Sequence, residues 1–308
     1  MTRWTAADIP DQTGRTVLIT GANSGLGHRS ARALAERGAR VLIACRNAEK
    51  GRAALTEIAR TATAQPELVE LDLADLASIR KAAEQVRERT GGLDALMNNA
   101  GVMATPRRST QDGFELQIGT NHLGHAALTW LLLPTMRPGA RVVTVSSLAH
   151  HGGGLDVDDL HFTRRRYHPV RAYSQSKLAN LLFALELDRA AKRADHDLIS
   201  VAAHPGMATT ELTRNSSQLR SMPTPVTGVV SIATRLVTQP AEQGALPQLF
   251  AATARGVRGG DYFGPSGVGE VRGHPTRARL SKAAQDPRTA QLLWQVTAEH
   301  TGIAPPWS

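Results

Sequence analysis

The chain of 308 residues has a single cysteine, Cys45, and few aromatic side chains: four Trp, three Tyr and five Phe. One cysteine excludes a framework of intrachain disulfides and a zinc site built from several cysteines. The reducing cytosol is therefore compatible with the sequence. The aromatic residues are not interleaved with basic ones, so the stacking surface of a nucleic-acid binder is absent. We expect no nucleic acid among the partners.

Long hydrophobic runs are also absent. A membrane-spanning helix needs about 18 consecutive apolar residues, and the best candidate, residues 122–136, is shorter and contains two histidines and a proline. Residues 1–12 carry two aspartates and lack the apolar segment of a secretion signal. The sequence therefore predicts a cytoplasmic protein without a membrane partner.

Acidic residues are outnumbered, because 36 Lys and Arg against 27 Asp and Glu give a formal charge of +9. Such an excess is compatible with nucleic acid, an acidic membrane or a phosphorylated small molecule. The basic residues are scattered along the chain, and their tightest group is 164–166. A solvated basic surface is the simplest interpretation, and an anionic substrate near 164–166 is the alternative.

Short aliphatic runs alternate with amphipathic stretches over the first two thirds of the chain. This alternation predicts an α/β fold with a doubly wound parallel sheet, three layers deep. After residue 205 the pattern weakens, and we expect 205–255 to supply a substrate-binding loop and helices within one domain, 1–308. The expected strands are 16–20, 40–44, 67–71, 93–97, 141–145, 198–202 and 261–263, and the expected helices are 28–37, 48–60, 76–89, 114–133, 173–193, 226–237, 240–253 and 285–299.

A glycine-containing turn follows the first expected strand and leads into the first expected helix. Glycine permits a tight turn and a close approach of backbone to phosphate, which the free N–H groups and dipole of the helix attract. The sequence predicts a phosphate-binding turn here, with a purely structural turn as the alternative. The residues concerned are Gly21, Asn23, Ser24, Gly25, Leu26 and Gly27.

Tyr173 and Lys177 are four residues apart in an expected helix, so their side chains lie on one face, one turn apart. A phenol has a pKa of about 10, and a neighbouring ammonium lowers that pKa by favouring the phenolate. A general acid or base works best when its pKa lies near the operating pH. The pair predicts proton transfer at Tyr173, although this spacing also occurs by accident.

Several motifs in order over residues 14–212 resemble those of the short-chain dehydrogenase/reductase family. The runs at 44–46, 121–125, 145–150 and 204–206 make the chain especially similar to the branch of retinol dehydrogenases and WW-domain oxidoreductases. The resemblance implies a Rossmann fold, and hydride transfer between a nicotinamide cofactor and a carbonyl or alcohol substrate. The motifs are Gly21-x-x-x-Gly25-x-Gly27, Asn98-Asn99-Ala100-Gly101, Asn121, Ser146-Ser147, Tyr173-x-x-x-Lys177 and Pro205-Gly206.

The resemblance also assigns roles to residues. Asn121, Ser147, Tyr173 and Lys177 are the implied catalytic residues; Ser147 would hold the substrate oxygen, and Asn121 a water in line with Lys177. Ser146 should point to the other face of the sheet, because strand side chains alternate. An ordinary helix-interior asparagine is the alternative for Asn121. The implied cofactor contacts beyond the glycine turn are Asp72, Leu73, Asn99, Ala100, Gly101, Tyr173, Lys177, Pro205, Gly206 and Thr210.

The residue after the second strand distinguishes NAD from NADP. A carboxylate there would bind the ribose hydroxyls of NAD and repel the extra phosphate of NADP. Here Cys45 is followed by Arg46, and a neutral side chain with a guanidinium suits a phosphate. We expect NADP(H) rather than NAD, with Arg46 as a contact; an exposed surface arginine is the alternative. Asp72 has its own alternative, as the N-cap of a helix beginning near Leu73.

We therefore expect an NADP-dependent oxidoreductase that acts on a small, apolar carbonyl or alcohol. A non-catalytic NADP-binding regulator on the same fold is the alternative. We expect no metal, because the histidine pairs His122/His125 and His150/His151 have no carboxylate or cysteine at ligand spacing. The resemblance implies a homodimer or a homotetramer.

Overall fold

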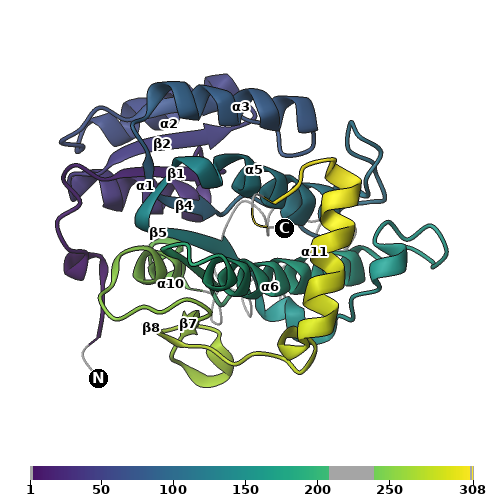
Figure 1. Cartoon of the computed structure of the whole chain (residues 1–308). Helices are drawn as coiled ribbons and strands as arrows, with labels where there is room; N and C mark the ends of the chain where they lie inside the picture. Colours follow the sequence, from purple (N-terminus) through teal and green to yellow (C-terminus); the bar gives the residue numbers. More distant parts are fainter. Residues whose placement is uncertain (1–2, 208–238, 306, 308) are drawn as a thin grey trace, which may run out of the picture.

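The computed structural model describes residues 3–207, 239–305 and 307, and within them a single sheet of eight strands is flanked by helices (Figure 1). The strand order is β3-β2-β1-β4-β5-β6-β7-β8, and every neighbouring pair is parallel except β7 and β8. The order reverses between β1 and β4, where doubly wound sheets bind ligands beyond the carboxyl ends of their strands. The predicted three-layer α/β fold is confirmed.

The elements follow the predicted alternation closely. The strands are β1 Thr16–Thr20, β2 Arg40–Cys45, β3 Glu67–Glu70, β4 Leu93–Asn98, β5 Met136–Val145, β6 Leu198–Ala203, β7 Tyr262–Pro265 and β8 Pro275–Arg277. The longer helices among the described residues are α1 Gly25–Glu36, α2 Ala48–Ala59, α3 Leu76–Arg89, α5 Gly124–Leu132, α6 Pro169–Arg193, α10 Ala241–Thr253 and α11 Pro287–Thr301. The expected helix 226–237 lies outside the described residues.

The two faces of the sheet bury different helices. Val17 and Ile19 of β1 pack in a cluster with side chains of α1, α2 and α10. Leu18, between them, packs on the other face with side chains of α3, α5 and α6. Because both faces are covered, the strand is apolar along its interior instead of alternating with polar residues. Figure 1 shows α11, in yellow, against α6, which extends this second layer outward.

The expected long helical region 114–133 is confirmed from Leu116 onward, but it is not a uniform α-helix. The segment is divided into α4 Leu116–Ile118, a π-helical turn over Gly119–Leu123, and α5. Two glycines allow this path: a Cβ on Gly119 would lie 2.5 Å from Thr110 Cγ2, and one on Gly124 would lie 2.3 Å from the Leu73 carbonyl oxygen. The π-helical turn carries Asn121, and single π-helical turns inside α-helices are frequent at functional sites.

Several element boundaries differ from the expected ones; for example, β5 begins at Met136 instead of residue 141. The helix expected over 173–193 begins at Pro169, with His168 as its N-cap residue, because proline is well suited to the first helical position. Tyr173 therefore lies in the second turn of α6. The sequence does not predict the antiparallel edge strand β8, since its three residues, Pro275–Arg277, show no apolar alternation.

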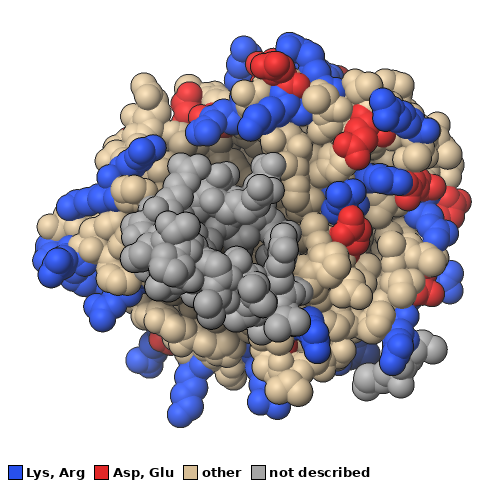
Figure 2. All heavy atoms as spheres, turned by 180° about the vertical axis from the view of Figure 1, so that it is seen from behind, with Lys and Arg blue, Asp and Glu red and all other residues tan. Residues whose placement is uncertain are grey.

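Charged side chains surround the face of the molecule that Figure 2 shows. Lys and Arg side chains are spread around the rim of this face with Asp and Glu among them. Within the part of the chain that the structure describes, no helix is both long and apolar enough to traverse a bilayer. Nor do three or more His, Cys, Asp or Glu side chains of these residues come together in a way that could hold a metal ion.

Three buried histidines predict a pH-dependent stability. Burial lowers the pKa of His122 from 6.5 to about 3 and that of His125 to about 4, and it also lowers the pKa of His204. Below pH 6.5 the unfolded chain takes up protons that the folded chain does not, so stability falls as the pH falls toward 4. The loss is about 1.4 kcal/mol per pH unit for each histidine.

Urea unfolding midpoints should therefore change little near pH 7 and fall steeply between about pH 6 and 5. His122→Phe, which removes one of the three groups, should make this decline less steep. Equal midpoints across the whole range would show that these histidines take up protons in the folded state.

Candidate active site

The glycine turn after β1 is shaped by close backbone contacts. Gly21 and Gly25 have φ angles of +66° and +57°, in the left-handed region that favours glycine. A Cβ on Gly27 would lie 2.5 Å from both the Gly21 carbonyl oxygen and the Asn99 side-chain nitrogen. The turn therefore wraps tightly over the start of α1 and leaves no space for a side chain at Gly27.

The N-terminus of α1 differs from those of α2 and α3, the next two helices along the chain. Ser24 is the N-cap residue of α1 but makes no capping hydrogen bond with its side chain. Asn47 and Asp75, in contrast, accept hydrogen bonds from the first turns of α2 and α3. The first N–H groups of α1 thus have no side-chain cap, and with the helix dipole they favour an anion at this point.

The turn after β4 is held against the turn after β1. The backbone N–H groups of Asn99 and Ala100 both donate to the Thr20 hydroxyl over 2.9 Å, and the Asn99 side chain donates to the Thr20 carbonyl over 2.8 Å. A Cβ on Gly101 would lie 3.2 Å from Asn121 Oδ1 and 3.5 Å from Lys177 Nζ. The two turns and the side chains of Asn121 and Lys177 therefore lie together at the switch point of the sheet.

Tyr173 lies on the face of α6 that meets the end of β5. The Ser147 hydroxyl lies close enough to this phenol to lower its pKa, and it accepts a hydrogen bond from the Ala149 backbone over 3.2 Å. Ser146 is buried, and its hydroxyl donates to the Lys177 carbonyl oxygen over 2.7 Å. The structure thus brings Ser147 to Tyr173 and directs Ser146 elsewhere.

The direction of the Tyr173 pKa differs from the expected one. Burial raises the pKa of the phenol above its ordinary value, and the hydrogen bond with Ser147 only partly opposes this. The expected net lowering of this pKa is wrong, because burial outweighs the effect of the Lys177 ammonium, which donates to the Val145 carbonyl over 3.0 Å and lies 5.8 Å from the Tyr173 ring centroid. Tyr173 is therefore protonated at neutral pH.

Lys177 and Asn121 lie behind Tyr173 in the interior. Burial lowers the pKa of Lys177 to about 8, so the side chain is an ammonium at pH 7. Asn121 is fully buried; its side chain accepts from the Val102 N–H over 2.8 Å and donates to the Val102 carbonyl over 2.9 Å. It also donates to Ser176 over 2.9 Å, which links the loop after β4 to α6.

Two buried histidines that the sequence does not indicate as site residues hold the backbone beside the candidate residues. His150 Nδ1 lies 2.7 Å from the Ser147 carbonyl oxygen. The Gly206 N–H donates to His204 Nδ1 over 3.2 Å, and His204 Nε2 lies 3.0 Å from Glu270. Their positions, three residues after Ser147 and directly before Pro205, are the only signals the sequence offers.

Arg46 follows β2 directly, and 74% of its side chain is exposed, with the Asp72 carboxylate 3.8 Å away. Cys45 is the last residue of β2 and is buried, so the first side chain beyond the strand is Arg46. The alternative of Asp72 as a helix N-cap is wrong, because Asp75 caps α3. The Leu73 side chain packs in the core, which leaves only its backbone for a ligand, and Thr210 lies outside the described residues.

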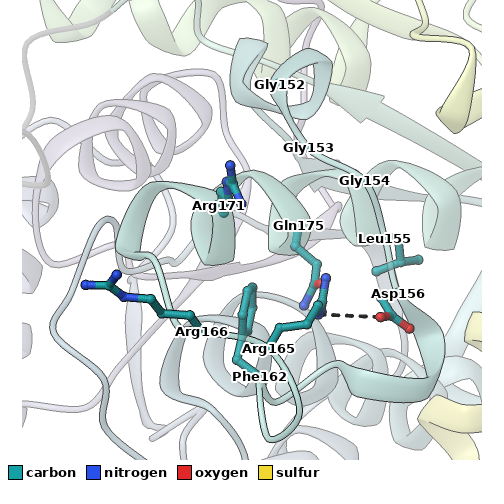
Figure 3. A pocket seen from close by; sticks show the side chains of 10 residues that line it. All are labelled: Gly152, Gly153, Gly154, Leu155, Asp156, Phe162, Arg165, Arg166, Arg171 and Gln175. Carbon is teal, nitrogen blue, oxygen red and sulfur yellow. Dashed lines mark hydrogen bonds and ion pairs between the residues drawn. The ribbon is translucent and has the colours of Figure 1, made fainter.

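A cavity of about 430 Å³ lies on the other side of α6, lined by residues that include Arg165, Arg166, Arg171 and Gln175. Gln175 is two residues after Tyr173 and thus on the opposite helix face. Figure 3 shows Arg165 directed at Asp156, while Arg166 extends to the opposite side of the view. The Arg165 guanidinium is already bonded to carboxylates and to Gln175 Oε1 at 3.1 Å. This cavity is therefore separate from the candidate active site.

The chain is similar to known proteins over most of its length. The family model described as short chain dehydrogenase matches residues 15–221. Retinol dehydrogenase 12 of Homo sapiens is 42% identical over 299 residues, which cover 94% of this chain and 87% of that protein. Retinol dehydrogenase 13 of Homo sapiens is 40% identical over 306 residues, covering 97% and 87%. The chain belongs to the short-chain dehydrogenase family, a family of oxidoreductases, and the predicted similarity to its retinol dehydrogenase branch is confirmed.

Solved structures share the fold. The crystal structure of an uncharacterised protein from Mycobacterium paratuberculosis is 44% identical, with a TM-score of 0.82, covering 99% of this chain and 100% of that one. The complex of Pseudomonas aeruginosa RhlG with NADP is 23% identical, with a TM-score of 0.64 over 81% of this chain and 94% of that one. The second likeness concerns the fold alone.

Proposed function

We propose that the protein is an NADP(H)-dependent oxidoreductase that interconverts a carbonyl and an alcohol. The observation that carries this proposal is the meeting of Tyr173, Ser147 and Lys177 beside the glycine turn, at the switch point of the sheet. The protonated phenol and the serine hydroxyl are two hydrogen-bond donors at one position, which is what a carbonyl oxygen gaining negative charge requires.

The residues present fit a dinucleotide. The closed contacts at Gly27 and the uncapped start of α1 make a surface on which a pyrophosphate fits and a side chain does not. The loops after β4 and β6 would hold the nicotinamide end, through Asn99, Ala100, Gly101, Pro205 and Gly206. When bound, a nicotinamide cofactor supplies or accepts the hydride.

The protein's own side chains would transfer the proton. Tyr173 donates its phenolic proton to the carbonyl oxygen during reduction and accepts one during alcohol oxidation. Ser147 holds the same oxygen in place. The buried Lys177 ammonium favours the phenolate once the proton has left, because opposite charges stabilise each other in a poorly hydrated site. Asn121 fixes the loop after β4 to α6 and keeps these groups in register.

The substrate is proposed to be apolar. Two of the relatives described above are retinol dehydrogenases by name, and retinol is an apolar alcohol. Met207, which follows the candidate cofactor residues Pro205 and Gly206, exposes 40% of its surface. An exposed methionine at this place suits an apolar ligand, since its flexible thioether adapts to irregular shapes. We propose that residues 205–255 form the substrate-binding region within one domain.

The function is tested by following NADPH oxidation with a panel of apolar and polar aldehydes and ketones. Turnover with apolar members supports the proposal. Protection of the protein by NADPH against heat, without turnover of any member, would favour a nucleotide-binding regulator instead. Gel filtration and cell fractionation test the expected homodimer or homotetramer and the cytoplasmic location.

The preference for NADP is tested by Arg46→Ala. The exposed guanidinium after β2 is free to bind a phosphate on the adenosine ribose, and such charged hydrogen bonds contribute about 1.5–3 kcal/mol. We expect the KM for NADPH to rise about tenfold or more, with little change in the KM for NADH. Arg52→Ala is the matched control, because 71% of that side chain is exposed and it also has a distant carboxylate partner. Equal changes with both cofactors would contradict the assignment.

A further inference from the structure

His125 connects two parts of the candidate site. It lies on α5 with 1% of its surface exposed, between the end of β1 and the π-helical turn. Its Nε2 lies 2.9 Å from the Thr20 hydroxyl, and its Nδ1 lies 2.9 Å from the Asn121 carbonyl oxygen. The imidazole thus connects the end of β1, which holds the turn after β4, with the backbone of Asn121.

The partners of the Thr20 hydroxyl determine which nitrogen of His125 carries the proton. The hydroxyl oxygen accepts two backbone N–H groups of the turn after β4, both at 2.9 Å, which fills its lone pairs. Its own hydrogen then goes to His125 Nε2 at 2.9 Å in preference to the Met97 carbonyl at 3.3 Å. A neutral imidazole that accepts at Nε2 carries its hydrogen on Nδ1, which therefore donates to the Asn121 carbonyl.

The surroundings keep this imidazole neutral. Burial is the main cause that lowers the pKa of His125 to about 4; the hydrogen bond with the Asn121 backbone opposes this lowering, and the nearby Lys177 ammonium adds to it. His122, the neighbouring histidine on the same segment, is itself neutral because burial lowers its pKa to about 3. The pattern of one acceptor and one donor nitrogen therefore persists at neutral pH.

Asn121, whose backbone is held by His125, is itself bonded to α6. Its side chain holds both backbone polar groups of Val102 and the hydroxyl of Ser176, the residue before Lys177. A hydrogen-bonded path therefore runs from the turn after β4 through Thr20, His125 and Asn121 to the helix that carries Tyr173. Every side chain on this path from Thr20 to Ser176 is buried.

We propose that His125 is a positioning residue that fixes the turn at 99–101 relative to the helix bearing Tyr173 and Lys177. Its kinetic consequence rests on the proposed function. Loss of the imidazole leaves the Thr20 hydroxyl with only the longer contact to the Met97 carbonyl at 3.3 Å, and it removes the His125 donor from the Asn121 carbonyl. The side-chain bonds of Asn121 to Val102 and Ser176 then lack the support of its anchored backbone, so cofactor binding and turnover are both reduced even though His125 touches neither cofactor nor substrate.

The kinetic test compares His125→Phe with His122→Phe. Both histidines are 1% exposed and lie one helical turn apart, but His122 faces α11, where its Nε2 lies 2.9 Å from the Thr297 hydroxyl. Both variants lose a buried hydrogen bond and should lose similar thermal stability. Only His125→Phe should weaken NADPH binding, measured by fluorescence, about tenfold and lower kcat about tenfold. Equal kinetics for the two variants would show that His125 is merely structural.

A second measurement needs neither activity nor a variant that folds. The ¹⁵N NMR spectrum of the histidine-labelled protein reports which ring nitrogen carries hydrogen. We expect a neutral Nδ1–H form for His125 at pH 7, unchanged down to about pH 5. An Nε2–H form or a charged ring would overturn the proposal. If no carbonyl is reduced at all, the proposed function fails, while the NMR form and NADPH affinity still decide the role of His125.

Discussion

Tyr173→Phe is expected to lower kcat about a thousandfold while the dissociation constant for NADPH changes less than about threefold. General acid catalysis contributes about 10²–10⁴ to a rate, and the change removes only the phenolic oxygen. The ring still fills the space between α6 and the end of β5, so the fold should persist. Kinetics in both directions, together with NADPH titration, measure the effect.

Tyr167→Phe is the matched control for this prediction. Tyr167 is half-buried like Tyr173, but its hydroxyl donates to the Thr105 carbonyl over 2.8 Å and serves a loop contact. It should lose some stability and keep its kcat. Comparable turnover in Tyr173→Phe and the wild-type protein would remove Tyr173 from the chemistry.

Gly27→Ala should weaken NADPH binding about a hundredfold. The added Cβ would lie 2.5 Å from the Gly21 carbonyl oxygen, which is backbone and can move only with the whole turn. Relieving such overpacking costs about 1–3 kcal/mol, and here the displaced atoms are the proposed phosphate cradle. Isothermal titration with NADPH measures the change, and a shift of the unfolding temperature with added NADPH gives a second reading.

Gly154→Ala separates this local effect from a general effect of replacing glycine. A Cβ on Gly154 would meet no other atom within 4 Å, and this glycine lies outside the glycine turn. The NADPH affinity of this variant should equal that of the wild-type protein. If Gly27→Ala also binds NADPH normally, the pyrophosphate does not lie on the start of α1.

Local patterns in the sequence are sufficient for the sheet and for the loops that carry the site. The helix at 76–89 is predicted to the residue, because its apolar spacing and the polar segments around it agree. Motif order places Tyr173, Ser147 and the glycine turn at the carboxyl edge of the sheet, since a parallel sheet brings all strand ends of one kind together.

Features that depend on tertiary contacts cannot be predicted in this way. The π-helical turn at Asn121 depends on close approaches of Gly119 and Gly124 to distant backbone and side-chain atoms, which helical periodicity does not encode. The raised pKa of Tyr173 follows from burial, whereas the spacing to Lys177 indicates only that an ammonium is near. The role of His125 depends on three-dimensional partners on two other segments.

A crystal structure of the protein with NADP tests the central claim most directly. The account predicts the pyrophosphate on the first N–H groups of α1, the adenosine phosphate beside Arg46, and the nicotinamide ring within contact distance of the Tyr173 hydroxyl. A nucleotide bound elsewhere, or a nicotinamide ring out of reach of both Tyr173 and Ser147, would contradict the account.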